Sequence, residues 1–476
     1  MKLRILTLAL ASAASPALAQ DFGSSVDAML AAQSMQYFGI AAPLAASAPS
    51  SFTPYRTAGQ TASDQIALAG GLTASYLTRD VADSLDMMAF FPADNPTHII
   101  GCIEGDREEI AAGKLNPSVQ SISLADGTVS TLLRGMVACD GIRTSPWGTV
   151  IATEEEDDGG VYEILDPLLI DNVVISDRAT GAVSDPAHVA KRTAMAVIAW
   201  EGFVMTPEGV VYGGDELRPG TDAPDADGGA LFKFIPATLY SGGMIASLDQ
   251  SPLVAGTSYA LQVSCQGASV QAGQGCEIGK GWWVEIDPAT ARASAFASHA
   301  AGYYRPEDLH QDPLFAGPGI RMCGANTGNE GASNYAEVMC YIDSEPTLAP
   351  APDADGKVTL SAEANRFVEG DPDFNSMDNL AFQPGTGILY VIEDHENGDI
   401  FACLPDGGDR DIKTDGCIKM LSVKDSSAEP TGFIFTPDGM TAYVSIQHSD
   451  DANMSPLDDY GTDDLVVITG FARPAM

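Results

Sequence analysis

A short motif recurs along the chain and constrains its fold more than any other feature. Six segments begin with a polar or acidic residue and reach a proline a few residues later, starting at Asp86, Cys139, Glu201, Glu307, Asp378 and Thr431. The spacing to the proline is six residues in five segments, and one residue longer from Cys139. Several segments continue through a turn into an apolar strand, as in TPEGVVYGG and TPDGMTAYV. Six strand–turn–strand units predict an all-β fold, a six-bladed β-propeller around a central channel.

Acidic residues also recur where the second strand of each unit is expected to end. They are Glu104, Glu154–Glu155, Asp215–Glu216 and Glu393–Asp394, and the last unit ends in Gln447–His448. Residues in one register of successive units lie at one level around a channel, so we expect a ring of carboxylates at one mouth. Clustered carboxylates repel one another unless cations neutralise them, so this ring predicts a site for multivalent metal ions. The alternative is that these acids are ordinary turn residues without function.

The charge of the chain points to the same class of ligand. With 24 Lys and Arg against 65 Asp and Glu, the net charge is −41, which argues against nucleic acid and anionic membranes as partners. The chain has six histidines, which argues against a histidine-rich zinc or haem site and favours hard cations such as calcium.

The N-terminus has the pattern of an export signal. Lys2 and Arg4 precede an apolar run over residues 5–14, and an A-x-A cleavage pattern follows at residues 17–19. We therefore predict a Sec-type signal peptide over residues 1–19, a single propeller domain over residues 20–476, and a periplasmic or secreted protein. No other stretch approaches the roughly 20 apolar residues of a membrane-spanning helix.

Eight cysteines agree with an oxidising compartment. Local spacing suggests three disulfides, Cys265–Cys276, Cys323–Cys340 and Cys403–Cys417. The remaining Cys102 and Cys139 either form a fourth disulfide or are kept for chemistry, and their spacing does not decide between the two.

The same segments resemble the PhoX-type alkaline phosphatases. The clearest match is EPTGFIFTPDGMTAYVSIQHS (429–449), followed by ACDGIRTSPWGTVIATEE (138–155), VYGGDE (211–216), YYRPED (303–308) and MDNLAF (377–382). The resemblance implies a six-bladed propeller whose axial site holds iron and calcium and hydrolyses phosphomonoesters.

The resemblance also implies roles for individual residues. Cys139 is similar to the iron-binding thiolate of the family, with the disulfide to Cys102 as its alternative. Carboxylate ligands are expected at Glu155, Glu201, Asp215, Glu307, Glu104, Asp394 and Glu429. Arg305 and Glu201 are the catalytic candidates, because a guanidinium can hold two phosphate oxygens and stabilise transition-state charge. Supporting positions are expected at Asp378, Asn379, Gln447 and His448.

The sequence therefore predicts a metal-dependent phosphomonoester hydrolase that acts on small phosphate esters outside the cytoplasm. Two alternatives stay open. The chain could be a non-catalytic, calcium-stabilised propeller that binds a partner or forms a scaffold, or another propeller hydrolase such as a lactonase or phosphodiesterase. Iron together with calcium would favour the phosphatase, and calcium alone the alternatives.

Overall fold

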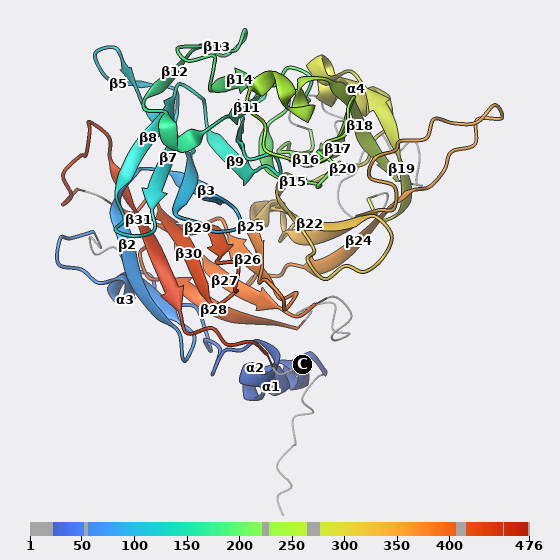
Figure 1. Ribbon diagram of the computed structural model, residues 1–476. Coiled ribbons are helices and arrows are strands. Elements are labelled where there is room, and N and C mark those ends of the chain that lie inside the picture. Colours follow the sequence, from blue (N-terminus) through green and yellow to red (C-terminus); the bar gives the residue numbers. More distant parts are fainter. Residues whose placement is uncertain are drawn as a thin grey trace, which may run out of the picture.

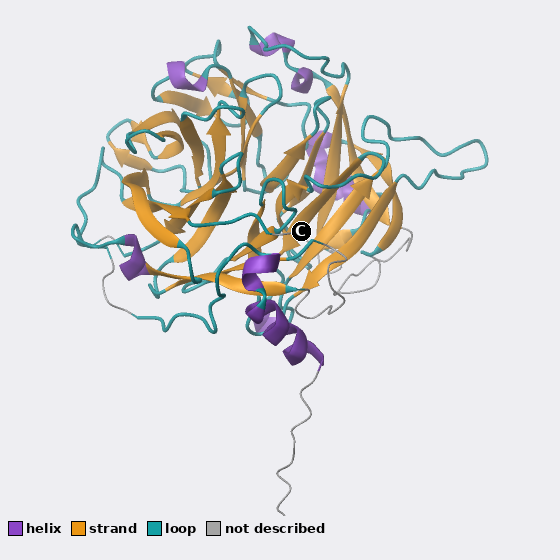
Figure 2. Ribbon diagram, turned by 60° about the horizontal axis from the view of Figure 1, so that its bottom comes forward, coloured by secondary structure: helices purple, strands orange, loops and turns teal. Residues whose placement is uncertain are grey.

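The computed structural model describes residues 22–51, 56–220, 228–263, 277–405, 416–450 and 452–474. The expected signal peptide and the Cys265–Cys276 pair lie outside these residues. Sheets stand side by side in a ring, and the few helices lie at its periphery (Figures 1 and 2). The helices are α1 (Phe22–Ala32), α2 (Ser34–Tyr37), α3 (Ala62–Gln65) and α4 (Ala291–Ala297). Among the described residues, none of the helices combines the length and the apolar composition that crossing a bilayer would take.

Hydrogen bonding divides the strands of the ring into four blade-like sheets and one larger sheet. The first sheet contains β3 (Leu85–Phe91), β4 (His98–Ile103), β7 (Pro117–Ser123), β8 (Val129–Arg134), β12 (Val173–Asp177) and β13 (Ala182–Val183). The second contains β9 (Cys139–Thr144), β10 (Val150–Glu154), β11 (Val161–Ile164) and β14 (Val189–Lys191). A small hairpin joins β5 (Glu109–Ala111) to β6 (Lys114–Leu115).

The larger sheet has ten strands because two of its outer strands, β19 and β24, pair with each other. It runs through β15 (Trp200–Met205), β16 (Val211–Asp215), β17 (Gly229–Pro236), β18 (Gly256–Val263), β19 (Gly279–Ile286), β24 (Ala362–Glu369), β23 (Glu337–Asp343), β22 (Ile320–Asn326) and β21 (Pro306–Gln311), with β20 (Gly302–Tyr303) on β17.

The last two sheets contain the C-terminal strands and two N-terminal ones. One is formed by β25 (Met377–Phe382), β26 (Leu389–Glu393), β27 (Asp399–Cys403), β28 (Cys417–Val423) and β1 (Ile66–Leu68), the other by β29 (Glu429–Phe435), β30 (Thr441–Gln447), β31 (Thr462–Thr469) and β2 (Thr73–Ala82). The structure thus confirms an all-β, propeller-like ring of blades, whereas the count of six blades stays a prediction.

The strands that start the six sequence repeats line the inside of this ring. Each of β3, β9, β15, β21 and β25 contacts the next one in chain order, and β29 closes the circle by contacting both β25 and β3. The strands behind them are buried on both faces by the neighbouring sheets, which explains continuous apolar runs such as Leu389–Ile392. The repeats therefore place equivalent residues around one axis.

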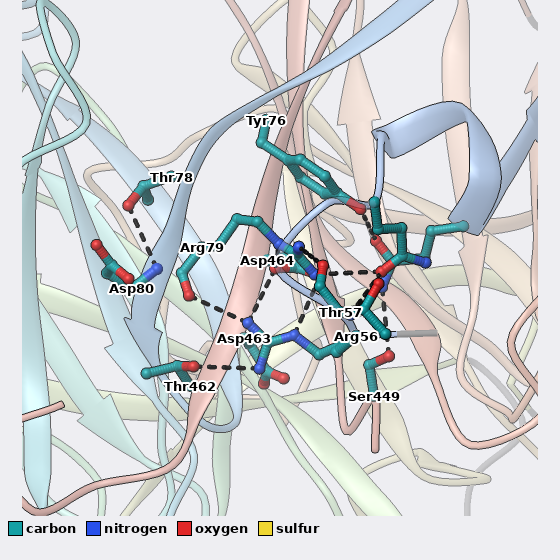
Figure 3. A network of polar contacts seen from close by, with 12 residues as sticks. Arg56, Thr57, Tyr76, Thr78, Arg79, Asp80, Ser449, Thr462, Asp463 and Asp464 are labelled. Carbon is teal, nitrogen blue, oxygen red and sulfur yellow. Dashed lines mark hydrogen bonds and ion pairs between the residues drawn. The ribbon is translucent and has the colours of Figure 1, made fainter. Parts of the chain in front are cut away.

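Pairing between the two ends of the chain closes the ring. Strand β2 lies antiparallel to β31, and the fully buried Arg56 binds this joint from the segment before it. Its Nη2 lies 2.9 Å from Asp464 Oδ1 and its Nη1 donates to the hydroxyl of Thr462, while Arg79 Nε binds Asp464 Oδ1 at 2.8 Å (Figure 3). Two arginines thus compensate one buried carboxylate, which ties the N-terminal segment to the closing sheet.

Candidate active site and metal centre

Each repeat has a first and a second strand. In at least five repeats, the residue that directly follows the second strand occupies an equivalent position. Its backbone N–H donates to the carbonyl of the residue just before the first strand of the same repeat, at 2.7–3.1 Å. The donor–acceptor pairs are Glu104–Ser84, Glu155–Ala138, Glu216–Ala199, Thr327–Arg305 and Asp394–Ser376. This shared hydrogen bond defines the register and places four acids and one threonine at one end of the channel.

The second residue of the first strand is acidic in five repeats. These residues are Asp86, Asp140, Glu201, Glu307 and Asp378. The pairing register shifts next to each of them, as a β-bulge does. Bulges turn a side chain out of the regular alternation and are common beside active sites. Four of the five acids are buried, and Asp378 is partly buried.

Seven carboxylates from these two series form three linked groups, which we call the acidic cluster. The groups are Asp86–Glu104–Asp140, Asp140–Glu155–Glu201 and Glu201–Glu307–Asp378, and within each group one oxygen per residue lies within 4.8 Å of the others. Asp140 and Glu201 each belong to two groups, so the cluster is continuous across repeats that are far apart in sequence.

Several buried oxygens of the cluster have no hydrogen-bond partner. They are Asp140 Oδ1, Glu201 Oε2 and Glu307 Oε2. A buried carboxylate oxygen without a partner is costly, and a bound cation would remove that cost. Hard cations such as calcium take several carboxylate oxygens as ligands, so this donor set fits them.

The same crowding shifts the pKa values of the cluster upward. Burial is the first cause for Asp86, Asp140, Glu155, Glu201 and Asp378, and a neighbouring carboxylate is the next, so their pKa values lie well above the usual range. Burial also raises the pKa of Glu104, and it raises that of Glu307 to about 8 although Arg305 opposes the shift. Without cations, the cluster would therefore hold protons near neutral pH.

Arg305 lies at the edge of the cluster among three acids. Its Nε is 2.5 Å from Glu216 Oε1 and 3.0 Å from Glu307 Oε1, and its Nη1 is 3.4 Å from Asp394 Oδ2. The backbone of Arg305 is left-handed, with φ of 63°, and its N–H donates to the carbonyl of Leu217. Acids from two other repeats thus orient the guanidinium through Nε and Nη1.

A cavity of about 330 Å³ begins one residue away from Arg305. Tyr304 and Asn326 line it, and the residues that follow them, Arg305 and Thr327, face the cluster, where Thr327 donates to Glu307. Arg366 and Glu337 lie on the cavity wall and form an ion pair. None of the described residues that line this cavity belongs to the acidic cluster, so the cavity is a separate space.

The structure brings most of the predicted site residues together. Glu104, Glu155, Glu201, Glu307 and Asp378 belong to the cluster, and Asp394 binds Arg305. At the edge, Glu429 faces His448 at 3.3 Å, and burial together with Asp394 raises the pKa of Glu429 to about 10. Gln447 donates to Glu104 at 3.0 Å, and Asn379 Oδ1 accepts from the N–H of Gly432. The single hydroxyl of Thr431 lies within hydrogen-bond distance of both Asn379 and Asp86 and can donate to one of them at a time.

Two predicted ligands are corrected. Asp215 is not in the cluster, because its two oxygens accept from Arg292 at 2.8 Å and from the N–H of Ala199. Cys139 is not a thiolate, because it forms a disulfide with Cys102, the alternative left open by the sequence. The expected disulfides Cys323–Cys340 and Cys403–Cys417 are confirmed.

The sequence did not single out Asp140, and it placed Asp86 and Glu216 among the repeated acids without naming them as candidate site residues. Asp86 and Asp140 are ligand candidates, and Glu216, one residue after Asp215, binds Arg305. A signal for Asp140 was present, since Asp140 and not Cys139 stands six residues before its proline, as in the other repeats. The six-residue spacing to the proline, applied to all six repeats, identifies Asp140 as the equivalent of the other acids.

Comparison with known proteins identifies the family of this chain. The family model described as "Alkaline phosphatase PhoX" matches residues 182–450. No curated protein matches. Among solved structures, PhoX of Pseudomonas fluorescens in complex with vanadate, a transition state analogue, has 17% identity and a TM-score of 0.57, covering 89% of this chain and 98% of its own. A gluconolactonase from Xanthomonas campestris has 12% identity and a TM-score of 0.40, covering 90% and 98%. The family match spans more than half of the chain, which therefore belongs to the alkaline phosphatase PhoX family and is an enzyme of the phosphatase type.

Proposed function

We propose that this protein hydrolyses small phosphomonoesters with metal ions bound in the acidic cluster, as an alkaline phosphatase outside the cytoplasm. The observation that carries the proposal is the continuous chain of seven carboxylates with Arg305 at its edge. A phosphate ester is an anion and would be repelled by these acids alone, so its binding requires that cations outweigh them. Membership in a phosphatase family supports the same reaction.

The residues that would hold the cations are the seven acids of the cluster. Calcium and iron are the cations that the family resemblance implies, and the preference of calcium for oxygen ligands matches this donor set. When bound, such ions neutralise the charge of the phosphate and lower the pKa of water. Glu201 and Asp140 have central positions among the ligands, because each belongs to two groups and has one unpartnered buried oxygen.

Arg305 would bind the phosphate and stabilise the negative charge that develops during transfer. Phosphoryl transfer depends on positioning and charge stabilisation more than on covalent steps by the protein. Glu216 binds Nε of Arg305 and Asp394 binds Nη1. The Nη2 nitrogen is therefore the part of the guanidinium that would bind phosphate oxygens.

The proposal includes the arrangement of the whole chain. We infer six blades, with the ten-stranded sheet counted as two blades joined through β19 and β24, because six first strands contact one another in a closed circle. Residues 1–19 would serve as a Sec-type signal peptide and residues 20–476 as one domain. Three disulfides among the described residues and membership in the PhoX family agree with a place outside the cytoplasm, and the periplasm or the medium is the compartment we propose.

Turnover of p-nitrophenyl phosphate at alkaline pH tests the function. We expect release of phosphate by the calcium-loaded protein, loss of activity with a chelator, and recovery when calcium is returned. The Arg305→Ala variant should lose turnover. Its thermal midpoint should stay close to that of the wild type in the calcium-loaded form, because the ions neutralise the acids with which Arg305 pairs. A folded, metal-replete protein without any phosphomonoesterase activity would refute the proposal. It would leave the two alternatives, a non-catalytic calcium-stabilised propeller or a lactonase or phosphodiesterase.

A further inference from the structure

The disulfide Cys102–Cys139 joins two segments that carry residues of the acidic cluster. Cys102 on β4 and Cys139 on β9 are both fully buried, and their Cα atoms are 5.0 Å apart. Cys102 stands two residues before Glu104, and Cys139 stands directly before Asp140. Glu104 and Asp140 belong to one group of the acidic cluster, so the disulfide joins the two neighbouring strands that carry them.

The disulfide changes the chemistry that this end of the cluster offers. A thiolate is a strong ligand for iron, but a disulfide sulfur carries no charge and binds metals poorly. The described residues contain no free cysteine, and the three groups consist of carboxylates alone. The thiolate–iron bond that the resemblance implied for Cys139 therefore does not fit this chain.

We infer that the disulfide makes this centre an all-oxygen site that binds calcium and excludes iron. The inference rests on the proposed metal-dependent function, but it concerns the identity of the ions and can be tested without turnover. Because Cys139 is in a disulfide, calcium without iron no longer separates the phosphatase from its alternatives, and turnover alone decides between them. Carboxylate oxygens without sulfur suit calcium, which accepts six to eight oxygen ligands in flexible geometry. Because Cys139 is in a disulfide, the site lacks the thiolate sulfur that would favour a transition metal over calcium.

Metal content and optical absorption of the wild-type protein test the inference directly. The protein is produced in an oxidising compartment and then incubated with calcium and iron together. We expect calcium in the protein, iron far below one ion per chain, no thiolate-to-iron absorption band in the visible region, and a disulfide-linked peptide that contains Cys102 and Cys139. Iron near one ion per chain, or a reactive thiol at position 139, would overturn the inference.

Two variants test whether the disulfide is the cause. Cys102→Ser frees the thiol of Cys139 beside Asp140 and should increase the iron content and add the visible band. The double variant Cys102→Ser/Cys139→Ser should keep calcium and bind no iron. If the single variant binds no more iron than the double variant, the disulfide is not what excludes iron and the inference fails.

Loss of a disulfide can also destabilise the fold, by typically about 2–5 kcal/mol. The matched control is Cys403→Ser/Cys417→Ser, which removes the disulfide between β27 and β28 and should leave the metal content unchanged. Circular dichroism shows which variants fold, and the wild-type measurement stands if the Cys102 variants do not. A protein that binds calcium without iron but hydrolyses no phosphomonoester would refute the proposed function and leave this inference intact.

Discussion

Removing the metal ions should make the stability of this protein depend strongly on pH. In the metal-free protein, burial and neighbouring acids raise the pKa of Glu307 from 4.5 to about 8. A carboxyl group whose pKa is raised by folding stabilises the folded state below its unfolded pKa, and this contribution is lost as the pH rises toward the folded pKa. The metal-free protein should therefore become less stable between about pH 4.5 and pH 8.

The size of the effect follows from the shift. A difference of one pKa unit corresponds to about 1.4 kcal/mol, so Glu307 alone would remove roughly 5 kcal/mol from the unfolding free energy by pH 8. Glu429, with its pKa raised to about 10, would continue the loss to higher pH. Total stabilities of proteins are about 5–15 kcal/mol, so the chelated protein should be close to unfolding at alkaline pH.

Urea unfolding of chelated and calcium-loaded protein at pH 5.5 and pH 9 measures this effect. The chelated protein should lose most of its stability between the two values, and the calcium-loaded protein should change little, because the ions stabilise the ionised carboxylates. Comparing the two forms cancels the repulsion that arises elsewhere from the net charge of −41. Glu307→Gln should reduce the loss in the chelated form. Equal urea midpoints of the chelated protein at both pH values would refute the reasoning.

Five other substitutions separate catalysis from folding. Arg305→Lys keeps the charge but loses the planar fork, so kcat should fall by about 100-fold or more at an unchanged thermal midpoint. Asp464→Ala removes the carboxylate that pairs with the buried Arg56 and should cost about 3–5 kcal/mol in urea unfolding. Lys280→Ala removes a surface ion pair whose lysine is 60% exposed and should cost at most about 1 kcal/mol. Glu216→Gln should lower kcat without unfolding the protein, because Glu216 orients Arg305. Asp215→Asn should lower the urea midpoint, because Asp215 pairs with Arg292 in the blade. Equal effects of the two variants on kcat would contradict the assignment of Glu216, and not Asp215, to the side that faces the channel.

The ring of acids could be predicted because repetition carries three-dimensional information. A single acidic residue such as Glu201 does not by itself predict a metal ligand. Acidic residues at the same position of successive repeats, however, must surround a common axis. The repeats therefore predict that Glu155, Glu201, Glu307 and Asp378 lie near one another, as they do in the structure. It could not give the distances among them or which oxygens remain without partners.

The error at Asp215 has a simple geometric cause. Side chains alternate along a strand, so a shift of one residue exchanges the side chain facing the axis with one facing the body of the blade. Asp215 and Glu216 are both acidic, and composition alone does not distinguish the ligand position from the structural one. In the structure Asp215 and Glu154 are the last residues of their strands and bind arginines, while Glu216 and Glu155 follow them and face the channel.

Cys139 shows a different limit of sequence reasoning. A thiolate ligand and a disulfide both require a buried cysteine beside the acidic cluster. The residues around Cys139 therefore do not distinguish the two alternatives. The outcome depends on Cys102, a residue of a different sheet, whose Cα lies 5.0 Å from that of Cys139 and so within the usual range for a disulfide. Whether two strands approach this closely is a property of how the blades pack. The chemistry of the centre is therefore decided at position 102 and not at position 139, so a homologous chain with Cys139 but without Cys102 should keep the thiolate.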